Sequence, residues 1–151
     1  MTATDLDLMK ALGLCVVAFL VIVAIHLICL HGAARVCRAR GWASDLRTLP
    51  FHYTIVFIVS VMALLFGLHL MTNFAWGIFM HMEGVLDGYR QCVFYSLENY
   101  TSLGLTRVQV PANWRMLAPM ISLSGVFCLA WSTAVLVSLF SHLYSFTPDD
   151  V

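Results

Sequence analysis

Three long apolar runs divide the chain. They are Ala11–Leu30, in which His26 is the one strongly polar residue, Tyr53–Met80 and Met116–Tyr144, and the last two contain no formal charge. An α-helix rises about 1.5 Å per residue, so about 20 apolar residues cross a hydrocarbon layer of about 30 Å. The pattern therefore predicts three transmembrane helices, and the last two are long enough to tilt or to protrude from the bilayer.

Composition agrees with this pattern. Hydrophobic residues make up 61% of the 151 residues and charged residues 11%, and eight bases balance eight acids. A soluble domain is about 45–50% apolar and about 25% charged. The composition excludes a disordered chain, a coiled coil and a basic nucleic-acid-binding domain. We therefore expect a small, all-α integral membrane protein with no nucleic-acid partner.

The sequence holds no pattern typical of an enzyme or a metal centre. It contains no nucleotide-binding loop, catalytic triad or suitably placed pair of carboxylates, so we expect no enzymatic activity. The five cysteines form no CxxC pair, and three of them, Cys15, Cys29 and Cys128, lie in the long apolar runs. We interpret them as small buried hydrophobic residues and expect neither a disulfide framework nor a bound metal.

The arginines predict the orientation of the chain. Residues 32–52 carry four of them against a single acid, and short cytoplasmic loops are rich in Lys and Arg. We expect residues 1–31 to form a first transmembrane helix with its N-terminus outside, 32–52 a cytoplasmic loop, and 53–151 a unit that ends in the cytoplasm. The location would be the cell (inner or plasma) membrane. The basic cluster, a candidate site for anionic lipids, consists of Arg35, Arg38, Arg40 and Arg47.

The segment between the second and third apolar runs is unusual for a loop. Gly88–Tyr100 could form about three helical turns, or about 20 Å, which is too short to cross a membrane. Thr101–Pro111 is rich in β-branched and small residues, so we expect an extended chain. Two interpretations fit: a re-entrant loop that lines a water-filled cavity, or a partly ordered outward loop with an interfacial helix.

The residues of this segment resemble a known family. Phe94–Arg107, FYSLENYTSLGLTR, is similar to the pore helix and selectivity filter of potassium channels and their bacterial relatives. Val110-Pro111, Trp114-Arg115 and Gly125 stand where small bacterial ion-channel-domain proteins carry the same residue types. The resemblance covers Tyr53 to about Tyr144, and it implies a pore module over residues 53–151 and a homotetramer.

The resemblance also implies roles for individual residues. Backbone carbonyls of a filter replace the water of a permeating ion, so monovalent cations such as K⁺ would pass without any bound cofactor. Gly125 would be a hinge or a helix contact. By position the filter would consist of Ser102, Leu103, Gly104, Leu105 and Thr106, with Thr101, Glu98 and Arg107 supporting the filter and the pore mouth.

Three filter positions differ from the family pattern. Leu105 replaces a Tyr, Thr106 replaces a Gly and Arg107 replaces an Asp. Arg107 would pair with Glu98, face the vestibule, or lie elsewhere on the surface. We therefore expect passive cation transport with altered or lost potassium selectivity. The alternative is a non-conducting scaffold or accessory subunit that keeps the fold.

Two histidines and several small residues lie inside the apolar runs. We expect His26 and His69 to differ in depth by one to two helical turns, and three roles stay open: hydrogen bonding between helices, ligation of haem or metal, and a proton-sensitive switch. Trp76 and Trp114 would lie near the outer interface. Small side chains in the third run suit close packing or a polar pore lining: Ser122, Ser124, Gly125, Ser132 and Thr133.

Overall fold

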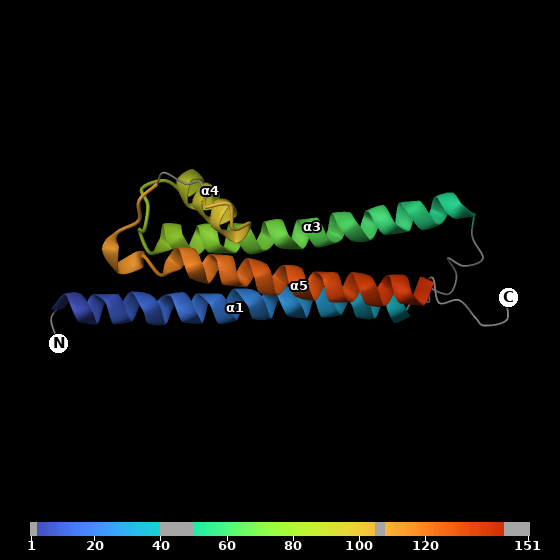
Figure 1. Ribbon diagram of the computed structural model, residues 1–151, viewed down its shortest axis with the longest axis horizontal. Helices are drawn as coiled ribbons and strands as arrows, with labels where there is room; N and C mark the ends of the chain where they lie inside the picture. Colours follow the sequence, from blue (N-terminus) through green and yellow to red (C-terminus); the bar gives the residue numbers. More distant parts are fainter. Residues whose placement is uncertain (1–2, 40–49, 105–107, 144–151) are drawn as a thin grey trace.

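A computed structural model describes residues 3–39, 50–104 and 108–143, and the regular elements in these ranges are helices (Figure 1). Within the described residues, three helices are long and apolar enough to cross a membrane, with spans over Leu6–Val36, Phe51–Met82 and Ala112–Ser141. The predicted all-α architecture with three such helices is confirmed, and it supports a multi-pass membrane protein. The elements are α1 (Ala3–Ala39), α3 (Phe51–Met82), α4 (Tyr89–Tyr100), the 3-10 turn η1 (Ala112–Trp114) and α5 (Leu117–Leu143).

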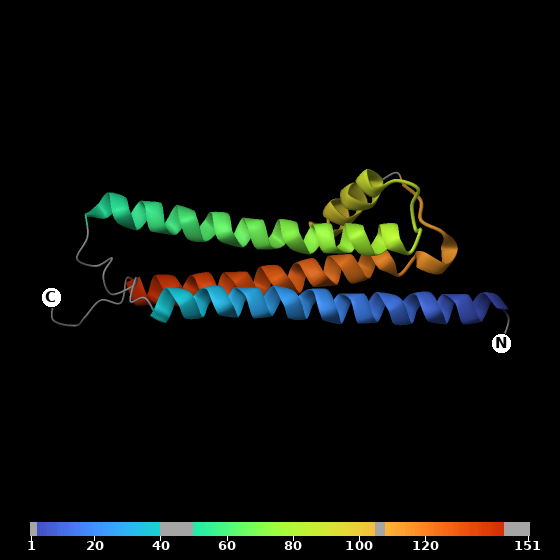
Figure 2. The same cartoon turned by 180° about the vertical axis from the view of Figure 1, so that it is seen from behind.

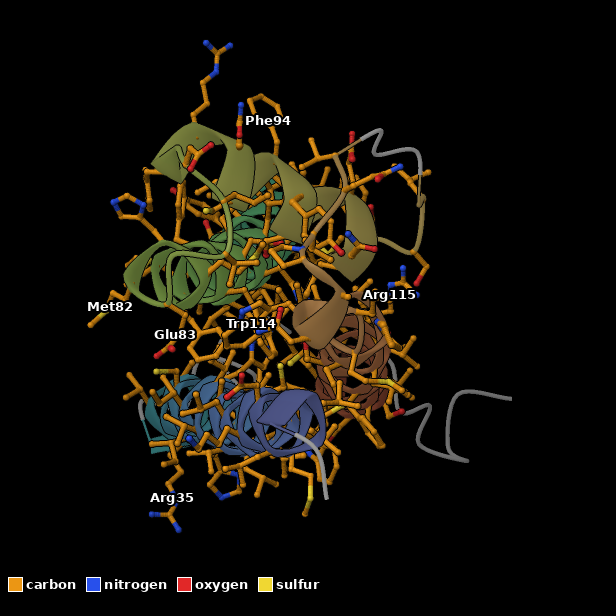
Figure 3. The ribbon with its side chains drawn as sticks, turned by 90° about the vertical axis from the view of Figure 1, so that its left-hand side faces the viewer. Arg35, Met82, Glu83, Phe94, Trp114 and Arg115 are labelled. Atoms are coloured by element: carbon orange, nitrogen blue, oxygen red, sulfur yellow. The ribbon has the colours of Figure 1, made fainter. Side chains whose placement is uncertain are left out.

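The first helix is longer than the apolar run that predicts it. It continues past Leu30 to Ala39, so residues 32–39 of the predicted loop are helical. Alanine and arginine are strong helix formers, and no proline interrupts this stretch. Arg35 lies on this extension and points away from the bundle (Figure 3). The side chains of Arg38, Arg40 and Arg47 are outside the described residues.

The four helices surround a common core. α1 and α5 run in one direction and α3 runs in the other (Figures 1 and 2). α3 and α5 make few direct contacts, because α1 packs between them on one side and α4 on the other. The end-on view shows this order around the bundle, with the side chain of Trp114 lying between α1 and the other helices (Figure 3).

The buried core lies toward the end of the bundle at which α4 packs. On α3 every buried residue falls between Leu65 and Met80. On α5 the buried residues fall between Leu117 and Ser132. One face of α1 is buried against this core. Its buried residues recur at roughly helical spacing: Ala11, Cys15, Ile22, His26 and Leu30.

Candidate functional site

Two glycines allow α4 to lie against its neighbours. A Cβ atom on Gly77 of α3 would lie 2.7 Å from a methyl carbon of Val93. A Cβ atom on Gly125 of α5 would overlap the backbone carbonyl oxygen of Tyr100 at the end of α4. Small residues at such positions let helix backbones approach closely. Gly125 is therefore a contact point between α5 and α4, one of the two roles expected for it.

Hydrogen bonds hold α4 at a fixed depth beside α3 and α5. The Ser96 hydroxyl lies 3.2 Å from both the carbonyl and the side-chain oxygen of Asn73, and the Ser122 hydroxyl donates to the Asn99 carbonyl at 2.7 Å. Because Gly125 is eight residues past Leu117, the end of α4 lies about 12 Å inside the beginning of α5. The short helix thus runs into the bundle and the chain then returns.

The return begins with a tight turn. The N–H of Ser102 donates to the Asn99 carbonyl and the N–H of Leu103 donates to the Glu98 carbonyl, both at 2.9 Å, while Ser102 has a φ of 58°. These two bonds and the left-handed residue form a Schellman motif, which ends a helix and satisfies its last carbonyls. The prediction of extended chain from Thr101 is therefore wrong for residues 101–104, because the motif reverses the backbone there.

The structure describes part of the predicted filter. Ser102, Leu103 and Gly104 are exposed on the turn, and Gly104 also has a positive φ, of 60°. Leu105, Thr106 and Arg107 lie outside the described residues, and so does the expected pairing of Glu98 with Arg107. Thr101 caps α4 by donating its hydroxyl to the Leu97 carbonyl at 2.9 Å.

The outward face of α4 is partly polar. Arg90, Gln91 and Thr101 are exposed on it and Glu98 is half-buried. Phe94 lies on the same face and points away from the other helices (Figure 3), with the Arg90 guanidinium 5.6 Å from its ring centre. Arg90, Gln91 and Phe94 of this face are therefore exposed at the surface of the described chain.

A buried polar network beside the C-terminal end of α4 joins all four helices. Nδ1 of His26 lies 2.9 Å from the Thr72 hydroxyl, and Nε2 of His26 lies 3.4 Å from the Ser132 hydroxyl. Nδ1 of His69 lies 2.7 Å from the Tyr100 hydroxyl. The Tyr100 hydroxyl also interacts with the side chains of Thr72 and Cys128. Of the three roles left open for the histidines, this geometry confirms hydrogen bonding between helices, and the proton-sensitive switch stays a prediction.

The hydrogen bonds define the protonation of His26. The Thr72 hydroxyl donates its proton to the Leu68 carbonyl at 3.0 Å, so it accepts from His26. His26 therefore carries its proton on Nδ1, and Nε2 accepts from Ser132. When His69 carries its proton on Nε2, its Nδ1 accepts a hydrogen bond from the Tyr100 hydroxyl, 2.7 Å away.

The expected difference in depth between His26 and His69 is wrong. Their ring centres lie 5.0 Å apart, with the ring planes tilted by 41°. A haem ligated by two histidines lies between their rings, and rings this close leave no room for it. Among the side chains that the structure describes, no three His, Cys, Asp or Glu residues gather as a metal site.

Several small residues of α5 serve helix packing, whereas Thr133 is exposed and bonds the Leu129 carbonyl of its own helix. Ser124 accepts a hydrogen bond from the indole N–H of Trp76 at 2.9 Å, and Ser132 bonds His26. Trp76 and Trp114, which we expect near the outer interface, are both buried between helices, and their depth in the membrane stays a prediction. Phe79 packs edge-on against each of the two indoles and joins them.

Sequence reasoning picked out the two histidines but not their partners. Thr72 lies three residues after His69, on the same face of α3, and this spacing is the one signal that could have linked them. Tyr100 carried no such signal, because its contact with His69 depends on how α4 folds back against α3.

Comparisons with known proteins found no relative of this chain. No family model, curated protein or solved structure matches the chain.

Proposed function

We propose that the chain is a pore-loop subunit that assembles as a homotetramer and conducts a monovalent cation passively, with altered or lost selectivity for K⁺. The observation that carries the proposal is the placement of α4. It enters the bundle beside Gly125, turns at Ser102 and leaves again, between two helices long enough to span a membrane. Non-helical backbone at membrane depth is tolerated where protein buries it or where it lines a water-filled cavity.

The polar face of α4 supports assembly. Glu98 is only half-buried and Gln91 is exposed, although both lie on a helix packed between apolar spans. Ionisable groups at membrane depth face a protein interior or a water-filled cavity. In a tetramer this face of α4 would meet neighbouring copies and the central axis. In contrast, the exposed face of α1 between Leu12 and Cys29 is apolar, as a lipid-facing surface should be.

Crosslinking tests the assembly. In a background with Cys29→Ser and Cys37→Ser, Phe94→Cys on the α4 face should form a crosslinked dimer in the native membrane, because one cysteine per subunit joins two neighbouring subunits. Ile28→Cys, on the apolar face of α1, is the matched control, because Ile28 is 70% exposed and should face lipid. Crosslinking at position 28 and not at position 94 would contradict assembly through α4.

Ion flux from reconstituted vesicles tests conduction. We expect K⁺ or Na⁺ to leave the vesicles in preference to an anion. Restoring the family residues with Leu105→Tyr, Thr106→Gly and Arg107→Asp should raise the preference for K⁺ over Na⁺. No flux of any ion from intact tetramers would disprove the channel function.

A specific observation favours the alternative, a non-conducting scaffold or accessory subunit. The last carbonyls of α4 are already bonded: Asn99 accepts from Ser102 and Ser122, and Glu98 accepts from Leu103 and Gly104. These carbonyls are not free to stabilise a cation at the helix C-terminus. If the restored variant conducts and the natural chain does not, the scaffold interpretation is correct.

The orientation and the lipid contact belong to the same proposal. The N-terminus would be outside, with Arg35, Arg38, Arg40 and Arg47 at the cytoplasmic surface, where each base contributes roughly 1 kcal/mol of attraction to anionic lipids. Arg35 is exposed and points away from the bundle, as this contact requires (Figure 3). Replacing all four with Gln should weaken the preference of the reconstituted protein for anionic lipids.

A further inference from the structure

We propose that His26 and His69 form a proton-sensitive latch on α4, in which the neutral pair holds Tyr100 and the uptake of one proton releases the end of α4. Release of α4 is a property of the fold by itself. Its use to control permeation rests on the proposed function.

The latch lies directly before the predicted filter, so a movement of the end of α4 would move the filter residues. Tyr100 is the last residue of α4, and the Schellman motif follows directly at Ser102. The Tyr100 hydroxyl is held by His69, and His26 of α1 is held by Thr72, which also interacts with Tyr100. A change in either imidazole therefore alters the hydrogen bonds that hold the end of α4.

An added proton turns a ring nitrogen that accepts a hydrogen bond into one that donates. On Nε2 of His26 it would meet the proton that Ser132 donates, and on Nδ1 of His69 it would meet the proton that Tyr100 donates. Each hydroxyl would have to turn its own proton away from the ring and accept from the ring instead. Protonation thus forces the Tyr100 hydroxyl at the end of α4 to rotate, and it places a positive charge directly beside that end.

No negative charge compensates for the proton. The titratable groups that face the pair are the other histidine, Tyr100 from α4 and Cys128 from α5, and within the described residues neither an acid nor another base joins them. The two rings lie only 5.0 Å apart, so a proton on one ring places a positive charge beside the other. That charge opposes the binding of a second proton. A buried cation without a partner favours a conformation that admits water.

Hydrogen exchange of α4 tests the latch in the intact protein in lipid vesicles. Exchange is measured at about pH 8 and about pH 5, the range over which histidine titrates, and corrected for the intrinsic pH dependence of amide exchange. The amides of residues 93–100 should exchange about tenfold faster at the acidic pH, because local opening sets their protection. Those of α3 near Met80 should change far less.

Two variants and one control make the result specific. Tyr100→Phe keeps the ring but removes the hydroxyl, so α4 should exchange rapidly at both pH values. The double variant His26→Gln with His69→Gln should abolish the pH response. His81→Gln is the control, because His81 is exposed and packs against Tyr89 at the other end of α4, 5.9 Å between ring centres. Its pH response should equal that of the natural chain.

Each result separates the latch from the proposed function. A pH response that disappears with His81→Gln, or that persists in Tyr100→Phe, would overturn the latch. Ion flux is measured on the same vesicles. If acid speeds α4 exchange but no ion moves, the latch stands and conduction fails, whereas ion flux with pH-independent α4 exchange leaves conduction intact and rejects the latch.

Discussion

The two halves of α3 pack in different ways. All the buried residues of α3 lie between Leu65 and Met80. This part of the helix contacts α1, α4 and α5 through a glycine contact and hydrogen bonds. From Phe51 to Leu64 none of its side chains is buried, and the helix diverges from the rest of the bundle (Figures 1 and 2). One continuous helix thus carries a packed C-terminal half and an unpacked N-terminal half.

The difference shows where the specificity of this fold lies. The C-terminal half of α3 packs against the polar groups of the bundle core, and all buried side-chain N and O atoms that the structure describes have hydrogen-bond partners. The N-terminal half of α3 presents apolar surface such as Val56 and Val59. Because hydrocarbon solvates apolar side chains as well as protein does, this half needs lipid or a second copy and no particular contact within the chain.

The largest effect should come from filling the contact between α5 and α4. Gly125→Leu places a side chain where the Tyr100 carbonyl lies, so the backbone of α4 must move away. We expect a loss of about 4 kcal/mol in the free energy of unfolding, at the upper end of overpacking effects. Denaturant titration in mixed micelles measures it.

Gly67→Leu is the matched control in the middle of α3. Nothing lies within 4 Å of a Cβ atom at that position, so the change should cost little. Equal losses at Gly125 and Gly67 would mean that the close approach of α4 is not a stabilising feature of the fold.

A neighbouring pair of leucines sharpens the boundary between the halves. Leu65 is 6% exposed and Leu64 is 47% exposed, so the same substitution can be made on either side of one helix. Leu65→Ala should cost about 2–3 kcal/mol because it leaves a cavity, whereas Leu64→Ala should cost less than about 0.5 kcal/mol. The same titration compares them, and a large loss at Leu64 would reveal a protein neighbour on that face.

Hydropathy and length were sufficient to place the helices. The short helix predicted over Gly88–Tyr100 is observed over Tyr89–Tyr100, and the Gly before it marks its beginning in the sequence. The end of α1 could not be placed this way, since residues 32–39 continue the helix without being apolar. Hydropathy detects the part of a helix that suits lipid and not the part that extends beyond it.

The contact between His26 and His69 could not be predicted, for a different reason. An apolar run defines which residues form a helix but not how far that helix is shifted along its neighbours. α1 begins beyond the ends of α3 and α5 on the side where α4 lies, and this stagger brings His26 level with His69 (Figure 1). Depth estimated from position within each run misses such a shift. The predicted filter residues Leu105 and Thr106 lie outside the described residues, so their role stays a prediction.

The smallest effect should be a gain of stability at the turn that ends α4. Ser102 adopts a φ of 58°, a conformation that costs a side-chain-bearing residue more than it costs glycine. Ser102→Gly should therefore stabilise the protein by about 0.5–1 kcal/mol, as glycine does at this position of a Schellman motif. Thr101→Gly is the control one residue earlier, where φ is −83° and the Thr hydroxyl bonds the helix, and it should destabilise the protein by about 1 kcal/mol. Opposite signs at these adjacent positions would show that the packed half of the bundle keeps its turn in the described geometry, and a loss at both would refute that turn.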